Sequence, residues 1–158
     1  MSTGTVELVR GSVGGDLGAE ITDFWVGQGL LTPAAAAERL GTVACVLRGA
    51  DGAIAGVNSV VAQPVTMVAG RTFWVYRSAL AAGTDDDDFF SMLSTCFDAL
   101  AREYEESGAG PVGVAVAVGD PGFLERNPEA IWPRVGFLYA GFQHDGQLRL
   151  RYFEGARI

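Results

Sequence analysis

Four consecutive aspartates at positions 85–88 are the densest group of ionisable side chains in the sequence. They precede apolar residues that recur every three or four positions, a spacing that predicts a long helix over 85–106. Carboxylates at a helix start cap backbone N–H groups and complement the helix dipole, for ~0.3–1 kcal/mol each. Four exceed what capping needs, because only a few N–H groups are free there. Cation binding is the alternative, but successive helical residues point in different directions and no metal site is predicted.

A second group of candidate residues lies just before the aspartates, in the strand-like segment 71–77. Side chains alternate between the two faces of a strand, so Trp74 and Tyr76 share one face and Arg77 takes the other. Core packing explains the aromatic pair, and the wall of a ligand pocket is the alternative.

Two single residues also belong to types that could do chemistry. His144 is the only histidine, beside a predicted turn, and no Ser or Cys with a nucleophile signature accompanies it. We therefore expect His144 at the surface and predict no catalytic triad. Asp120 follows an apolar strand, where open sheets often place ligand groups, although Asp-Pro-Gly is also an ordinary turn.

The elements that must position these residues form a mixed pattern of strands and helices. The chain has 158 residues, 49% of them hydrophobic and 19% charged, which predicts one domain over 1–158. Period-two alternation and β-branched runs predict strands, and period-3.6 spacing predicts helices. The predicted strands are 5–10, 42–47, 54–62, 71–76, 111–118, 137–142 and 148–153; the predicted helices are 19–27, 33–40, 85–106 and 123–133.

Composition excludes several partners. The formal net charge is -8 and every one of the eleven basic residues is arginine, so nucleic acid and anionic membranes are poor partners. No apolar run reaches ~18 residues and no signal-peptide pattern opens the chain, so we expect a cytoplasmic protein that is not in the membrane. Cys45 and Cys96 fall in apolar segments and are expected to be core residues.

The order of elements, β-α-α-β-β-β-α-β-α-β-β, resembles the GNAT N-acyltransferase superfamily over nearly the whole chain. The resemblance is strongest near the end, where Trp132-Pro-Arg-Val-Gly136-Phe137 is similar to the family's Tyr-x-x-x-Gly-Phe. It implies an α/β fold with a GNAT-like mixed central sheet flanked by helices. It also implies transfer of an acyl group from acyl-CoA, or another acyl thioester, to a small-molecule amine.

The segment that the resemblance assigns to the cofactor departs from the family pattern. The family binds the acyl-CoA pyrophosphate with Arg/Gln-x-x-Gly-x-Gly/Ala between the fourth strand and the long helix. Residues 77–84 here read Arg-Ser-Ala-Leu-Ala-Ala-Gly-Thr, with one glycine and a different spacing. A diphosphate there would also meet the aspartates, at ~1 kcal/mol of repulsion per charge pair, so ordinary acyl-CoA binding is disfavoured. The cofactor-binding residues implied are Arg77, Ser78, Ala79, Leu80 and Gly83.

The catalytic residues implied by the resemblance are also altered. The tyrosine that often serves the family as general acid would fall at Trp132, whose indole N–H is not a practical proton source. Tyr76, Asp120 or a water then has to move the proton. In the family layout two neighbouring strands splay apart to form a cleft. The substrate-binding residues expected around such a cleft are Phe24, Trp25, Asn58, Trp74 and Trp132.

Two other functions stay open from the sequence. A non-catalytic binding or assembly protein could keep the fold after losing acyl-CoA binding, with Phe24, Trp25 and Phe73 as an exposed apolar patch for a homodimer. An enzyme that takes its acyl group from a carrier-protein thioester is the third reading. Small-molecule amine, second copy and carrier protein are therefore the expected partners.

Overall fold

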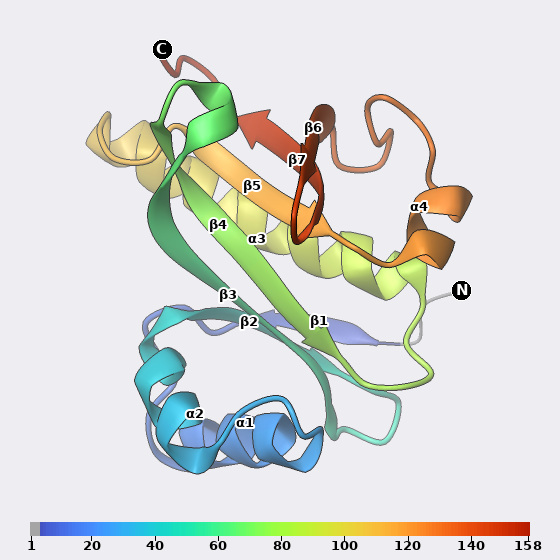
Figure 1. Ribbon diagram of the computed structural model, residues 1–158. Helices are drawn as coiled ribbons and strands as arrows, with labels where there is room; N and C mark the ends of the chain where they lie inside the picture. The colour runs from blue at the N-terminus through green and yellow to red at the C-terminus, as the bar shows by residue number, and fades with distance from the viewer. Residues whose placement is uncertain (1–3) are drawn as a thin grey trace. The chain divides into compact units, whose positions relative to one another are not determined.

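The structure is a computed structural model that describes residues 4–158. Seven strands form one mixed, mostly antiparallel sheet in the order β1-β2-β3-β4-β5-β7-β6, with β4 and β5 parallel (Figure 1). The strands are β1 Thr5–Leu8, β2 Val43–Arg48, β3 Ile54–Val65, β4 Arg71–Leu80, β5 Gly113–Val118, β6 Leu138–Gln143 and β7 Gly146–Tyr152. The helices are α1 Gly15–Gly27, α2 Pro33–Arg39, α3 Asp86–Ser107 and α4 Pro121–Arg126, with 3-10 turns η1 Leu40–Thr42 and η2 Thr66–Val68. This confirms the predicted mixed α/β class.

The chain divides into two compact units. The first contains the residues up to Val60 together with Ser78–Cys96, and the second contains Val61–Arg77 together with Phe97–Ile158. Each unit has its own hydrophobic core. Within the part of the chain that the structure describes, no helix is long and apolar enough to cross a membrane.

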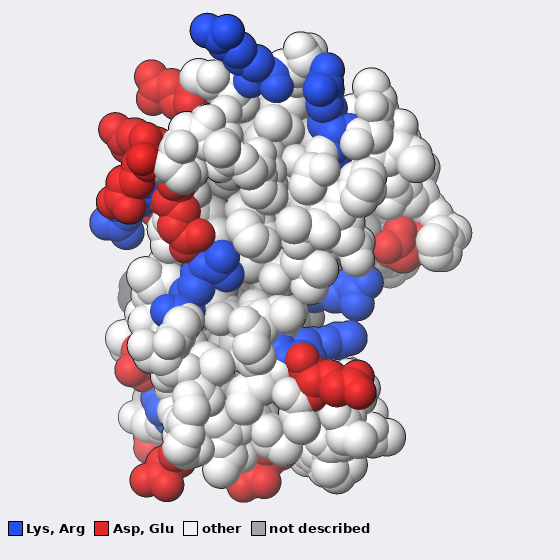
Figure 2. Space-filling view, turned by 90° about the vertical axis from the view of Figure 1, so that its left-hand side faces the viewer, with Lys and Arg blue, Asp and Glu red and all other residues white. Residues whose placement is uncertain are grey.

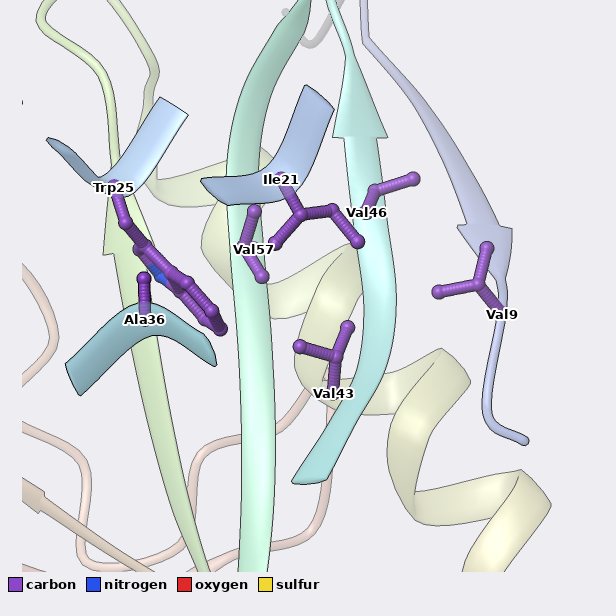
Figure 3. Close-up of a cluster of buried hydrophobic side chains, with 7 residues drawn as sticks. All are labelled: Val9, Ile21, Trp25, Ala36, Val43, Val46 and Val57. Atoms are coloured by element: carbon purple, nitrogen blue, oxygen red, sulfur yellow. The ribbon is translucent and has the colours of Figure 1, made fainter. Parts of the chain in front are cut away.

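The core of the first unit lies between α1, α2 and the strands β2 and β3. Figure 3 shows Trp25 of α1 beside Ala36 of α2, and Ile21 between the side chains of Val46 and Val57. Ile21 and Trp25 are four positions apart, so they fall on the same face of α1. Both are buried, with exposed fractions of 0% and 4%.

Helix α1 begins at Gly15, four residues before the predicted start. The glycines of this segment were expected to form a loop, but Gly18 is buried inside the helix. A side chain at Gly18 would collide with the carbonyl oxygen of Val13 and with Leu40. Close packing requires a glycine at this position. The sequence pattern alone does not distinguish such a glycine from one that marks a loop.

The core of the second unit lies on one face of β4, β5 and β7. Its buried members are Val65, Phe73, Ala115, Leu148 and Leu150. Strand β5 pairs with β4 on one side and with β7 on the other, so it is an interior strand, as its continuous run of small apolar residues predicts. The hairpin of β6 and β7 turns at His144 and Asp145, where the sequence predicts it.

Two strands are longer than predicted. Strand β3 continues through Pro64, which was expected to end it; the β2–β3 register ends with Val43 opposite Ser59, so Pro64 lies where β3 has extended past β2. A missing N–H costs little where no neighbouring strand needs it. Strand β4 continues to Leu80 through residues predicted as a turn, and the N–H of Ala81 still donates to Ala55 O at 2.8 Å.

Candidate functional site

The parallel pairing of β4 and β5 is short. Its register runs from Trp74 opposite Val114 to Tyr76 opposite Val116. Strand β5 goes on to pair with β7 as far as Val118, two residues beyond its last residue paired with β4. The β4–β5 pairing therefore ends at Tyr76, and backbone and side-chain groups beyond the paired part of two parallel strands can become available to a ligand.

A pocket of about 200 Å³ lies at this point in the second unit. Its volume is below the ~300–1,000 Å³ of pockets that hold drug-sized ligands, so it suits a small molecule. Strands β3, β4, β5, β6 and β7, the turn η2 and the β6–β7 turn all contribute to it. The lining residues are Gln63, Pro64, Val65, Thr66, Val75, Tyr76, Arg77, Ala115, Ala117, Gln143, Asp145 and Leu148.

Two charged residues of opposite sign line this pocket. Arg77 is the residue of β4 that follows the last β5 pair, and Asp145 lies in the β6–β7 turn. Period-two alternation puts Arg77 on the same face as Phe73 and Val75, which pack in the core beside the pocket. Both charged residues are exposed. Of the predicted cofactor-binding residues, the structure thus places Arg77 at a pocket.

Tyr76 and Asp120, the predicted catalytic residues, differ in their surroundings. Tyr76 borders the pocket and is 2% exposed. Asp120 is exposed two residues after the end of β5 and caps α4, because its Oδ1 accepts a hydrogen bond from Gly122 N at 3.0 Å. The turn reading of Asp-Pro-Gly therefore describes its local structure, and Tyr76 is the better placed of the two candidates.

Trp132 is an interior residue. It is 0% exposed, its indole N–H donates to Asn127 O at 3.2 Å, and the guanidinium of Arg149 lies 4.5 Å from its ring centroid. Arg149, itself 1% exposed, donates to the carbonyl oxygens of Glu129 and Ala130. Burial lowers the pKa of Arg149, against the opposing charge of Glu129. The pair fixes the segment after α4, and this placement gives no support to the prediction that Trp132 contacts a substrate.

Three other predicted substrate-binding residues belong to the first unit, and none lines the pocket. Phe24 is partly buried beside the α1–α2 core, and Trp25 is inside it. Asn58 is 1% exposed, accepts a hydrogen bond from Cys45 N at 2.7 Å and donates to Met92 O at 3.3 Å. Its amide therefore has a structural role in joining β2, β3 and α3. The fourth, Trp74, is a partly buried β4 residue opposite Val114.

The cysteine bonded by Asn58 is an inert core residue. Burial raises the pKa of the Cys45 thiol to about 11, although its hydrogen bond with Asn58 acts in the other direction. A thiol with a raised pKa forms little of the reactive thiolate. Cys96 is also buried, and both cysteines are free, as the sequence predicts.

The start of α3 is closed by a reciprocal pair of aspartates. Asp88 N donates to Asp85 Oδ1 at 2.9 Å, and Asp85 N donates to Asp88 Oδ2 at 3.1 Å. This is a capping box, in which two residues three positions apart satisfy one another's backbone donors. The bond from the Asp88 N–H is the main cause of a pKa of Asp85 below its ordinary value. The capping interpretation of these two aspartates is confirmed, and the Asp-x-x-Asp spacing was its signal in the sequence.

The segment between β4 and α3 lacks the glycines and the open helix start that a diphosphate would use, which disfavours ordinary acyl-CoA binding. Ser78, Ala79 and Leu80 are still part of β4, and Gly83, with φ +91, is the one glycine among residues 77–84. Thr84 Oγ1 donates to Ala81 O at 2.8 Å, which closes the turn internally. The helix dipole favours an anion at this end, but the carboxylates of Asp85 and Asp88 already occupy the capping positions.

The charges on the surface are unevenly mixed. Figure 2 shows basic side chains on one face as separate groups with uncharged surface between them, and acidic side chains gathered mainly toward its margins. On this face there is no continuous basic area of the kind that nucleic acid or anionic lipid requires.

Comparison with solved structures identifies the fold. A GNAT superfamily phosphinothricin acetyltransferase from Sinorhizobium meliloti, in complex with AcCoA, matches with a TM-score of 0.62 and 16% identity over 98% of this chain and 95% of that chain. The chain has the GNAT fold. A GNAT family N-acetyltransferase from Escherichia coli in complex with CoA matches with a TM-score of 0.57 and 13% identity, over 99% of this chain and 87% of that one.

A third structure agrees with this result. A GNAT family acetyltransferase from Streptococcus pneumoniae matches with a TM-score of 0.56 and 12% identity, over 93% of this chain and 96% of that one. No protein-family model matches the sequence, and no curated protein matches it either. The likeness is therefore one of fold, and it confirms the resemblance inferred from the order of elements.

Proposed function

We propose that this protein transfers an acyl group from a thioester donor to a small amine. The observation that carries the proposal is the end of the β4–β5 pairing at Tyr76, beside a small pocket with polar and charged walls. Two proteins of the same fold hold AcCoA or CoA in their structures, which supports an acyl-CoA thioester as the donor. The size of the pocket favours a small acceptor.

The proton chemistry assigns a role to Tyr76. A neutral amine that attacks a thioester carbonyl forms an amide and releases a thiolate, so one proton leaves the nitrogen and one reaches the sulfur. Tyr76 is the first candidate for that transfer, because it is among the residues around the pocket and a phenol both donates and accepts hydrogen bonds; alternation along β4 puts its side chain on the face opposite Arg77. Asp120 is the second candidate, and its carboxylate also has to hold the start of α4.

The pocket residues contribute mainly by holding the acceptor in place. Orientation of two reactants alone supplies a large part of many rate enhancements, worth up to ~7–11 kcal/mol in well-oriented systems. The backbone around Tyr76 is fixed by pairing to β5, and Val75 and Ala115 pack in the core beneath it. A rigid wall of this kind suits positioning better than a mobile loop does.

A second candidate function is favoured by the closed start of α3. A capping box in place of a glycine-rich cradle removes the contacts that a diphosphate would use, so the fold could serve as a non-catalytic binding protein. A carrier-protein thioester remains a candidate donor within the first proposal. In that case the phosphate need not approach residues 77–84.

Release of free thiol tests the proposal directly. The protein is incubated with acetyl-CoA or with acetyl-pantetheine, which lacks the diphosphate, and with a panel of small primary amines. Amine-dependent thiol release is expected, and Tyr76→Phe is expected to lower kcat by ~10²-fold or more if the hydroxyl carries the proton. Absence of acetyl-CoA binding together with absence of thiol release supports the second candidate. If calorimetry at about 1 mM shows that neither donor binds, acyl transfer from these two donors is refuted.

A further inference from the structure

The pocket beside Tyr76 carries one positive and one negative side chain on separate elements. Arg77 comes from β4, and Asp145 comes from the turn between β6 and β7. Among the described residues neither side chain takes part in an ion pair, with the other or with a third group. Both charges therefore keep their capacity to bind a ligand.

The rest of the lining combines aliphatic and neutral polar residues. Val65, Val75, Ala115 and Leu148 provide aliphatic contacts, and neutral polar groups such as Gln63 and Gln143 lie at other positions around the pocket. An apolar wall with a few placed polar groups is the usual composition of a small-molecule site. The volume, about 200 Å³, corresponds to about seven water molecules at ~30 Å³ each, which limits the ligand to a small compound.

We propose that this pocket binds a small zwitterion of the amino-acid type, with its carboxylate at Arg77 and its ammonium group at Asp145. A planar guanidinium donates two parallel hydrogen bonds to a carboxylate, whereas Asp145 can only accept from a cation. The aliphatic wall contacts the carbon skeleton between the two ends. As the acceptor of the reaction, the ligand must first lose one proton from its ammonium group to water to become the neutral amine, and in this role it rests on the proposed function; as a bound ligand it does not.

The experiment measures binding without any acyl donor. The standard α-amino acids are screened at low millimolar concentration by thermal shift, and positives are followed by calorimetry. Each positive is compared with its methyl ester, which lacks the carboxylate charge, and with the matching acid that lacks the amine. At least one amino acid is expected to bind on the order of tenfold more tightly than either relative, because each relative loses one charged hydrogen-bonding partner.

Charge-neutral variants locate the site. Arg77→Gln is expected to abolish the difference in affinity between the amino acid and its methyl ester. Asp145→Asn is expected to abolish the difference in affinity between the amino acid and the matching acid without the amine. Arg71→Gln and Asp98→Asn make the same changes of charge at exposed positions outside the pocket and are expected to leave binding unchanged. All four positions are exposed, so loss of fold does not confuse the result.

Several results would overturn the zwitterion site. The first is that no amino acid binds. The second is that the acid without the amine binds as tightly as the amino acid, which would indicate a simple anion site. The third is that neither Arg77→Gln nor Asp145→Asn changes the affinity for the amino acid. Failure of the proposed function is distinguishable, because it would leave amino-acid binding intact with no thiol released from any donor. Conversely, turnover of amino acids at an undiminished rate in Arg77→Gln would refute the zwitterion site and keep the acyltransferase.

Discussion

The aspartates at the start of α3 lead to a prediction about donor selectivity. Asp86 and Asp87 lie in the first helical turn between the two members of the capping box, so their charges can be removed while both box bonds are kept. The double variant Asp86→Asn/Asp87→Asn is expected to bind acetyl-CoA more tightly. Its affinity for acetyl-pantetheine should stay the same, since that donor has no diphosphate to be repelled.

The magnitude follows from the charges removed. One unit pair at 4 Å in water interacts by ~1 kcal/mol, and screening at physiological salt reduces this for exposed groups. Removing two carboxylates should thus strengthen acetyl-CoA binding by ~1–2 kcal/mol, which is about 5- to 30-fold in Kd. The gain should shrink strongly at ~1 M salt, where the Debye length is ~3 Å.

Calorimetric titration of both donors at low and high salt provides the assay, and it requires no turnover. The control is Glu105→Gln/Glu106→Gln, which makes the same change in net charge, from -8 to -6, on exposed residues near the other end of α3. An equal gain in the control would mean that overall charge, and not the helix start, opposes the donor. No change in either variant would refute the view that these carboxylates disfavour the diphosphate.

Three further predictions concern stability and are tested by chemical denaturation. Trp25→Ala should cost ~3–5 kcal/mol because it empties the core of the first unit, whereas Leu30→Ala, at a side chain 53% exposed, should change stability by less than ~0.5 kcal/mol. Asn58→Ala should cost ~1–3 kcal/mol by leaving the buried N–H of Cys45 without its acceptor, and a variant of full stability would contradict that account. The lowered pKa of Asp85 contributes stability that is present above the ordinary carboxyl value of ~3.9 and is lost as pH falls through the folded-state value. Asp85→Asn keeps a capping oxygen but has no charge, so its stability relative to wild type should rise as pH falls from 5 to 2, and a constant difference would contradict the assignment.

Local signals in the sequence identify the elements well where the deciding contact is also local. Thr32 followed by Pro33 predicts the start of α2, and the structure shows the Thr32 side chain accepting from Ala35 N. Asp145-Gly146 predicts the last hairpin, which turns there. In each case the residues that decide the structure are within a few positions of one another.

The predicted ends of strands are wrong where contacts with residues distant in the sequence determine where a strand ends. The end of β4 was placed at the small residues that follow Arg77, but Ala81 N finds a carbonyl partner at Ala55, which no local pattern reveals. Pro64 was taken as the end of β3 because proline breaks ladders, and the structure accepts it where β3 has passed the end of β2.

The pocket residues were also only partly predictable from the sequence. Arg77 was a candidate because the family resemblance assigns it to the cofactor-binding segment, and the structure places it in the lining of the pocket. Asp145 was not among the candidates, since nothing in the sequence indicates that residues 77 and 145 line the same pocket. They do so because β5 and β7 are neighbours in the sheet, and β4 pairs with the other edge of β5. Long-range strand order is what sequence periodicity leaves undetermined.

At the start of α3, the energies of the individual aspartates distinguish the residues that stabilise the helix from those that affect ligand binding. The reciprocal bonds of Asp85 and Asp88 satisfy two backbone donors, so those two residues account for the cap. Asp86 and Asp87 each gain ~0.3–1 kcal/mol from the helix dipole, and repulsion among adjacent carboxylates offsets a similar amount. The net effect of Asp86 and Asp87 on the free energy of folding is therefore small. Both carboxylates repel an arriving diphosphate, so their two contributions to the donor's binding free energy add. Neutralising these two residues should consequently leave the free energy of unfolding within ~0.5 kcal/mol of wild type and still change donor affinity severalfold. A large loss of stability together with unchanged donor affinity would reverse this assignment and make the acidic helix start purely structural.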